Sequence, residues 1–87
     1  MIRDAFTVLI ADDNPNNLFT LETLIQAHMQ ARVLRAEHGE EVLAILLNEK
    51  VDLIILDVQM PRMDGFECAK LIRMRPADRD IPILFLT

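Results

Sequence analysis

The chain has 87 residues, of which 52% are hydrophobic, which is enough for one domain with a real core. Its formal net charge of −5 argues against nucleic acid or an anionic membrane surface as the main partner, because both favour a basic surface. A single cysteine, Cys68, excludes an internal disulfide, and no apolar run approaches the roughly 18 residues of a membrane span. We therefore expect a small cytoplasmic domain.

The first half of the chain alternates apolar runs with a helical pattern. Residues 6–11 are rich in β-formers, which predicts a buried strand. Asn14 followed by Pro15 is typical of a helix start, with asparagine as the N-cap. The residues that then recur at helical spacing are Leu18, Leu21, Leu24, Ile25 and His28. Residues 31–37 predict a second strand, which is more exposed because polar residues interrupt it.

The second half repeats this alternation. Gly39 opens a predicted helix whose first turn carries acids that suit the positive end of the helix dipole. Its apolar face consists of Val42, Leu43, Leu46 and Leu47. Residues 53–56 are apolar at consecutive positions, which predicts a strand buried on both faces. Asp64 and Gly65 lead into a third helix, and residues 81–87 predict a fourth strand. The predicted inward residues of the third helix are Phe66, Ala69 and either Leu71 or Ile72.

Two groups of charged residues have ordinary structural interpretations. The arginines that follow the third helix are interpreted as a solvated helix end, favourable to the dipole, rather than as a nucleic-acid patch: Arg73, Arg75 and Arg79. The histidines are interpreted as a helix residue, His28, and a turn residue, His38, and neither is expected to bind metal or carry phosphate.

The order of these elements predicts the fold class. Strands that alternate with helices imply a parallel sheet with right-handed crossovers, an open, doubly wound α/β layer. In such sheets the site lies at the carboxyl ends of the strands, near the point where the strand order reverses. The residues at those ends are therefore the candidates for function.

Acidic residues occupy those ends. Asp12 and Asp13 follow the first predicted strand and Asp57 follows the third, so the three carboxylates converge if these strands are neighbours. Without a lysine or arginine beside them the carboxylates repel one another, which raises their pKa values. Mg²⁺ resolves this repulsion, because it prefers oxygen ligands. With the metal bound, a phosphoryl donor can approach and a carboxylate can attack it.

Each residue at or near these strand ends has a predicted role in the site. Asp57 is the predicted nucleophile because it ends the most apolar strand, and the main-chain carbonyl of Gln59 is placed to supply a further metal ligand. Pro61 and Gly65 are expected to shape the loop, Pro61 by fixing φ and Gly65 by permitting a turn that other residues disfavour. Thr87, at the end of the fourth strand, is placed to bond a phosphoryl oxygen.

These residues carry a family resemblance. The segments "LIADDN", "LIILDVQMPRMDG" and "IPILFLT" together resemble the receiver domain of two-component response regulators, the CheY-like family. The resemblance implies a flavodoxin-like sheet with strand order 2-1-3-4. It implies that Asp57 accepts phosphate from a phosphohistidine on a sensor histidine kinase or phosphotransfer protein, and that Asp12 and Asp13 bind Mg²⁺. It also implies that Thr87 moves toward the phosphoryl group and relays its presence to an output domain.

The sequence departs from the family in its extent. The receiver domain that the sequence resembles consists of five β-α units, whereas this sequence covers four strands and three helices. We therefore expect residues 1–87 to be the N-terminal part of one receiver domain, without the last helix-strand-helix and without the lysine that pairs with the phosphoryl group. The fourth strand would then be an edge with unpaired backbone, and we expect a homodimer to form through it.

Other functions fit the same residues less well. A phosphatase of the haloacid dehalogenase type needs a second acid two residues after the nucleophile, where this chain has Gln59. A flavodoxin-like binder of FMN needs a phosphate loop after the first strand, and "DDNPNN" would repel a phosphate. A degenerate receiver that serves only for protein interaction or dimerisation remains the alternative. We expect no enzyme activity beyond assistance to the domain's own phosphorylation and dephosphorylation.

Overall fold

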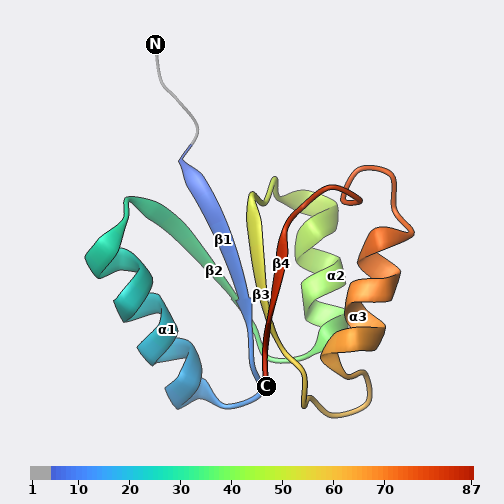
Figure 1. The fold of residues 1–87 in the computed structure, drawn as a ribbon, viewed down its shortest axis with the longest axis horizontal. Helices are drawn as coiled ribbons and strands as arrows, with labels where there is room; N and C mark the ends of the chain where they lie inside the picture. Colours follow the sequence, from blue (N-terminus) through green and yellow to red (C-terminus); the bar gives the residue numbers. More distant parts are fainter. Residues whose placement is uncertain (1–4) are drawn as a thin grey trace.

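The computed structural model describes residues 5–87, which form a four-stranded sheet with helices on both faces (Figure 1). The strands are β1 (Phe6–Ala11), β2 (Ala31–Ala36), β3 (Leu53–Asp57) and β4 (Ile83–Leu86), and the helices are α1 (Pro15–His28), α2 (Gly39–Asn48) and α3 (Gly65–Arg73). The strands lie in the order β2-β1-β3-β4, and each neighbouring pair is parallel. Helix α1 covers one face of the sheet, and α2 and α3 cover the other. The predicted doubly wound α/β fold with order 2-1-3-4 is confirmed.

Strand β1 lies at the centre of the hydrophobic core. Leu9 and Ala11 pack in the cluster under α2 and α3, whereas Val8 and Ile10 pack in the cluster under α1, because successive side chains of a strand point to opposite faces. All four side chains are fully buried. Full burial of an aliphatic side chain stabilises a fold by roughly 1.5–3 kcal/mol. This strand is therefore a fixed support for the residues that follow it.

Side-chain caps define where the helices start. Asn14 caps α1 and Pro15 follows it, as predicted. Asp64 accepts the backbone N–H of Glu67 at 2.8 Å and Glu67 accepts the backbone N–H of Asp64 at 3.3 Å, a reciprocal pair that starts α3. His38, predicted to lie in a turn, caps α2 by accepting a backbone N–H on Nδ1. Within residues 5–87, no helix is both long enough and apolar enough to cross a membrane.

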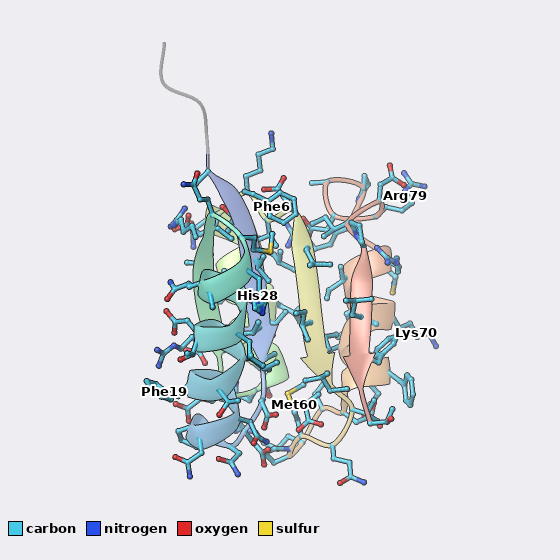
Figure 2. The ribbon with its side chains drawn as sticks, turned by 60° about the vertical axis from the view of Figure 1, so that its left-hand side comes forward. Phe6, Phe19, His28, Met60, Lys70 and Arg79 are labelled. Atoms are coloured by element: carbon cyan, nitrogen blue, oxygen red, sulfur yellow. The ribbon has the colours of Figure 1, made fainter. Side chains whose placement is uncertain are left out.

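Three side chains predicted to face the core are exposed instead. The exposed fractions are 54% for Leu24, 69% for Leu47 and 57% for Phe66, and Phe19 also points outward from α1 (Figure 2). A helix on a sheet buries only the stripe that touches the sheet, and the apolar pattern of the sequence was wider than that stripe. Phe66 instead packs against Phe85 of β4, with ring centroids 5.0 Å apart.

The bounds of three strands also differ from the prediction. Strand β2 ends at Ala36 rather than at residue 37, β3 extends to Asp57 rather than to residue 56, and β4 spans Ile83–Leu86 rather than residues 81–87. Pro82 precedes β4 and lacks a backbone N–H, so it pairs with β3 only by accepting the N–H of Ile54, at 3.0 Å. In α3, the inward residue of the two alternatives is Ile72, which is fully buried.

The predicted solvated arginine cluster is exposed at Arg73 and Arg79, but Arg73 and Arg75 also contact the segment that follows α3, which was not predicted. Arg73 donates from Nη1 to the carbonyl oxygens of Arg79, at 2.8 Å, and of Ile81, at 2.6 Å. Arg75 pairs with the buried carboxylate of Asp78, with 2.8 Å between Nη1 and Oδ2. The two guanidinium groups therefore hold the segment between α3 and β4 by its carbonyls and its one buried acid.

Candidate functional site

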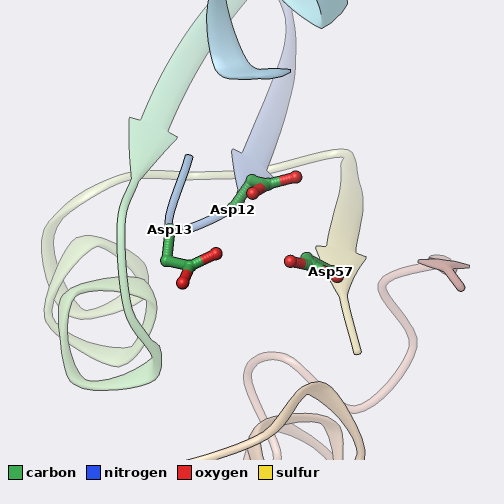
Figure 3. Close-up of side chains that lie close together, drawn as sticks. All are labelled: Asp12, Asp13 and Asp57. Atoms are coloured by element: carbon green, nitrogen blue, oxygen red, sulfur yellow. The ribbon is translucent and has the colours of Figure 1, made fainter. Parts of the chain in front are cut away.

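Three carboxylates meet at the carboxyl end of the sheet. Asp12 and Asp13 directly follow β1, Asp57 ends β3, and the register pairs Ala11 with Leu56, so the two strand ends lie side by side. One oxygen from each carboxylate lies within 4.8 Å of one oxygen from each of the others (Figure 3). The predicted convergence of these acids is confirmed.

Asp12 is held from two directions. Its side chain is nearly buried, with 3% exposed. Oδ1 accepts the backbone N–H of Asn14 at 2.9 Å, and Oδ2 accepts the side-chain amide of Asn17 at 3.1 Å. Asn17 was not among the predicted site residues. The signal that points to it is its place in the first turn of α1, because side chains there lean back toward the helix N-terminus and the acids that precede it.

Asp57 has no cationic partner within residues 5–87. Its Oδ1 accepts the backbone N–H of Gln59 at 3.1 Å. Burial raises the pKa of Asp57 above its usual value, and the charges of Asp12 and Asp13 raise it further, although the Gln59 hydrogen bond opposes them. None of the ion pairs found within residues 5–87 includes any of the three acids. The repulsion predicted from the sequence therefore acts on Asp57.

Gly65 shapes the loop by close approach rather than by an unusual turn. A Cβ atom at this position would lie 2.5 Å from the carbonyl oxygen of Asp57 and 2.9 Å from the Cα of Val58. Other residues are thus disfavoured at this turn for lack of space and not for a left-handed φ, since no described glycine has a positive φ and the residue that does is Arg62, at 67°. The N–H of Gly65 donates to the carbonyl of Val58 at 2.8 Å, which closes the loop. Pro61 contributes a carbonyl that accepts the N–H of Met63 at 2.7 Å.

A pocket opens beside the acids. Its volume is about 450 Å³. The lining residues are Asp12, Asn17, Thr20, Leu21, Asp57, Gln59, Leu86 and Thr87. Gln59 and Thr87, both predicted site residues, therefore share one pocket with Asp57, although Thr87 lies one residue beyond the end of β4. Asp13 stands outside this lining and is exposed.

The donor set fits a hard divalent cation. Three carboxylates at this spacing offer only oxygen ligands, which suits Mg²⁺, and the charges of Asp12 and Asp13 add to the effect of burial in raising the pKa of Asp57. A 2+ ion would remove that repulsion. The residues therefore fit the metal that the sequence predicts.

The fold and this site define a class of protein. Residues 8–87 match the response regulator receiver domain family, and the chain belongs to that family. The resemblance found in the sequence is confirmed.

Particular relatives agree with this assignment. The chain is 41% identical over 83 residues to the sensor histidine kinase GacS of Pseudomonas protegens, a match that covers 92% of this chain and 9% of that kinase. It is 30% identical over 80 residues to the protein PilH of Pseudomonas aeruginosa, covering 92% of this chain and 65% of that protein. The chain thus spans less than two thirds of the length of each of these relatives.

Solved structures show the same fold. The N-terminal domain of a response regulator receiver protein from Methanoculleus marisnigri JR1 superposes with a TM-score of 0.90 at 38% identity, covering 97% of this chain and 68% of that chain. The receiver domain of the sensor histidine kinase PA1611 from Pseudomonas aeruginosa PAO1 superposes with a TM-score of 0.88 at 26% identity, covering 97% of this chain and 68% of that chain. In that structure a magnesium ion is coordinated in the active site cleft.

Proposed function

We propose that the chain is the phosphoacceptor receiver module of a two-component response regulator, and that Asp57 takes the phosphoryl group. The observation that carries this proposal is the meeting of three carboxylates, within 4.8 Å of one another, at the end of two buried parallel strands. Membership of the receiver family supports it. The degenerate receiver, which would only bind other proteins, is the weaker candidate because all three acids are present and converge.

The proposed reaction is a phosphoryl transfer. A carboxylate oxygen of Asp57 attacks the phosphorus atom of a phosphohistidine on a sensor histidine kinase or phosphotransfer protein. The new O–P bond forms as the N–P bond breaks, and the imidazole leaves with the electron pair of that bond. Gln59 holds one Asp57 oxygen through its N–H, which orients the carboxyl group. Thr87 would bond a phosphoryl oxygen and relay the change, a role supported by its place in the lining of the same pocket.

The proposed cofactor is Mg²⁺. Asp12, Asp13, Asp57 and the main-chain carbonyl of Gln59 would hold it, while Pro61 and Gly65 keep the shape of the loop. A bound Mg²⁺ supplies charge neutralisation for the phosphoryl oxygens as they enter an acidic site. The magnesium seen in the PA1611 receiver supports this choice of metal.

The wider role of the chain follows from the same proposal. We infer that residues 1–87 are the N-terminal part of a receiver domain, which is supported by their coverage of 68% of the receiver structure from Methanoculleus marisnigri. The partners are then a kinase that donates phosphate and an output domain that reads the change. The setting is the cytoplasm, where ATP feeds such kinases. The domain acts on no other substrate and assists only its own phosphorylation and dephosphorylation.

Acetyl phosphate tests the proposal. Incubation with acetyl phosphate and Mg²⁺ should add the mass of one phosphoryl group to the intact protein, and EDTA should prevent it. Asp57→Asn should abolish the addition, whereas Asp80→Asn, the same change at an exposed acid outside the site, should leave it intact. If the Asp57→Asn variant takes up as much phosphate as the wild type, the proposal is contradicted. If the wild type takes up none, the degenerate receiver is favoured.

A further inference from the structure

Asn17 is a pocket residue that contacts a proposed metal ligand but has no role in the proposed reaction. It lies in the first turn of α1, and its side-chain Nδ2 donates to Oδ2 of Asp12 at 3.1 Å. It lines the pocket together with Asp12 and Asp57. The asparagine therefore touches the site from the helix side, whereas the acids reach it from the strand ends.

The contact fixes the orientation of a carboxylate that has little freedom to begin with. Asp12 is 3% exposed, and the backbone N–H of Asn14 already holds its Oδ1 at 2.9 Å. One donor on each oxygen leaves further lone pairs on both, so the amide does not compete with a metal for the whole carboxylate. Two fixed donors also prevent the carboxylate from turning away from the neighbouring acids, which repel it.

We propose that Asn17 is a positioning residue that orients Asp12 for Mg²⁺. The inference rests on the proposed function, because it takes Asp12 to be a metal ligand. Partners that orient a metal ligand commonly contribute 10- to 100-fold in metal affinity. An exposed amide at the edge of a pocket belongs at the lower end of that range, so we expect its removal to weaken Mg²⁺ binding about tenfold.

Isothermal titration calorimetry with Mg²⁺ measures the metal affinity directly and tests this inference without any phosphoryl transfer. Asn17→Ala should weaken binding about tenfold. Asn16→Ala is the matched control, because Asn16 precedes Asn17 in the same turn and the hydrogen bonds found for it within residues 5–87 involve its backbone, so the Mg²⁺ affinity of this variant should stay at the wild-type value. Asn17→Gln keeps an amide donor and should recover part of the loss. Asn17→Met keeps the bulk without the donor and should match Asn17→Ala.

The rate of phosphorylation by acetyl phosphate gives a second, different readout. The Mg²⁺ concentration that gives the half-maximal rate should rise about tenfold in Asn17→Ala. The rate at saturating Mg²⁺ should stay unchanged, because a bound metal ion holds the Asp12 carboxylate in the same orientation. A variant that melts at a lower temperature but binds Mg²⁺ as the wild type does would overturn the inference and leave the proposed function standing. A wild-type protein that binds no Mg²⁺ would overturn both.

Discussion

Gly65 shows how closely a single residue can be fitted to the site. The space that a Cβ would need is taken by the carbonyl oxygen of Asp57, 2.5 Å away, and by the backbone of Val58. Neither group can move without shifting the end of β3, which carries the proposed phosphoacceptor. At Gly39 a Cβ would also meet an atom at 2.5 Å, but that atom is the sulfur of Met63, at the end of a flexible side chain. The two glycines are the first residues of their helices.

The first prediction compares alanine at these two glycines. Gly65→Ala should lower the free energy of unfolding by about 2–3 kcal/mol, because backbone atoms must shift to admit the methyl group. Gly39→Ala should cost about 1 kcal/mol or less, because Met63 can take another rotamer. Urea denaturation followed by circular dichroism measures both. Equal losses in the two variants would show that the Asp57 carbonyl is not the obstacle.

Cys68 supplies a prediction about pH. The thiol is fully buried, and burial, with a smaller contribution from the charge of Glu40, raises its pKa from 9.0 to about 11. Because the folded state holds the proton more tightly than the unfolded state, the thiol's contribution to stability is complete below pH 9 and is lost as pH rises toward 11. The loss should reach roughly 2–3 kcal/mol.

The measurement is urea denaturation of the wild type and Cys68→Ala between pH 8 and pH 11. The difference in unfolding free energy between the two should change by that amount in favour of the alanine variant. Every other group that titrates in this range is present in both proteins, so its effect cancels in the difference. A difference that stays constant across the range would mean that the thiol ionises as easily in the folded protein as in the unfolded one.

At the scale of whole elements, the sequence predicted the type and order of all seven strands and helices, because those depend on local patterns. The run of apolar residues in β3 and the Asn14-Pro15 start of α1 are each recognisable from a few consecutive residues. Leu24 and Phe66 were predicted wrongly, since whether they are covered depends on how much of each helix the sheet touches. The contact of Asn17 with Asp12 was not predicted, because it depends on how the first turn of α1 is oriented relative to the end of β1.

The connection between α3 and β4 gives the element-scale prediction. Arg73 holds this segment through the carbonyls of Arg79 and Ile81, contacts with no signature in the sequence. Arg73→Met, which keeps the length of the side chain without its donors, should cost about 1–2 kcal/mol, since hydrogen bonds from charged groups contribute about 1.5–3 kcal/mol and exposure weakens these. Thermal denaturation measures the loss.

The matched control is Arg79→Met. The side chain of Arg79 is exposed and forms no hydrogen bond or ion pair found in residues 5–87, so this variant should stay within about 0.5 kcal/mol of the wild type. Equal effects of the two substitutions would mean that the carbonyl contacts of Arg73 do not stabilise the connection. In that case Arg73 would act only as an exposed residue of the helix end.

At the scale of the whole molecule, strand β4 forms an edge of the sheet through which two copies of the chain can associate. Within residues 5–87, strand β4 pairs with β3 on one side only, so in this part of the chain its other side presents unpaired backbone groups. Leu84 is 55% exposed and Phe85 is 39% exposed on this strand. We propose that two copies pair through β4 across a two-fold axis, which would join two four-stranded sheets into one. A natural edge strand avoids this with lysine or proline, and β4 has neither between Ile83 and Leu86.

Sedimentation equilibrium tests this pairing. The wild type should sediment as a species with twice the chain mass of 10.0 kDa, with dissociation on dilution. Leu84→Lys should shift the protein to the monomer, because two like charges would face each other across the new strand pair. Leu47→Lys places the same charge at a leucine that is 69% exposed on α2, and it should leave the dimer intact. A wild type that stays monomeric at every concentration would exclude pairing through β4, and dissociation by Leu47→Lys alone would move the interface to the α2 face.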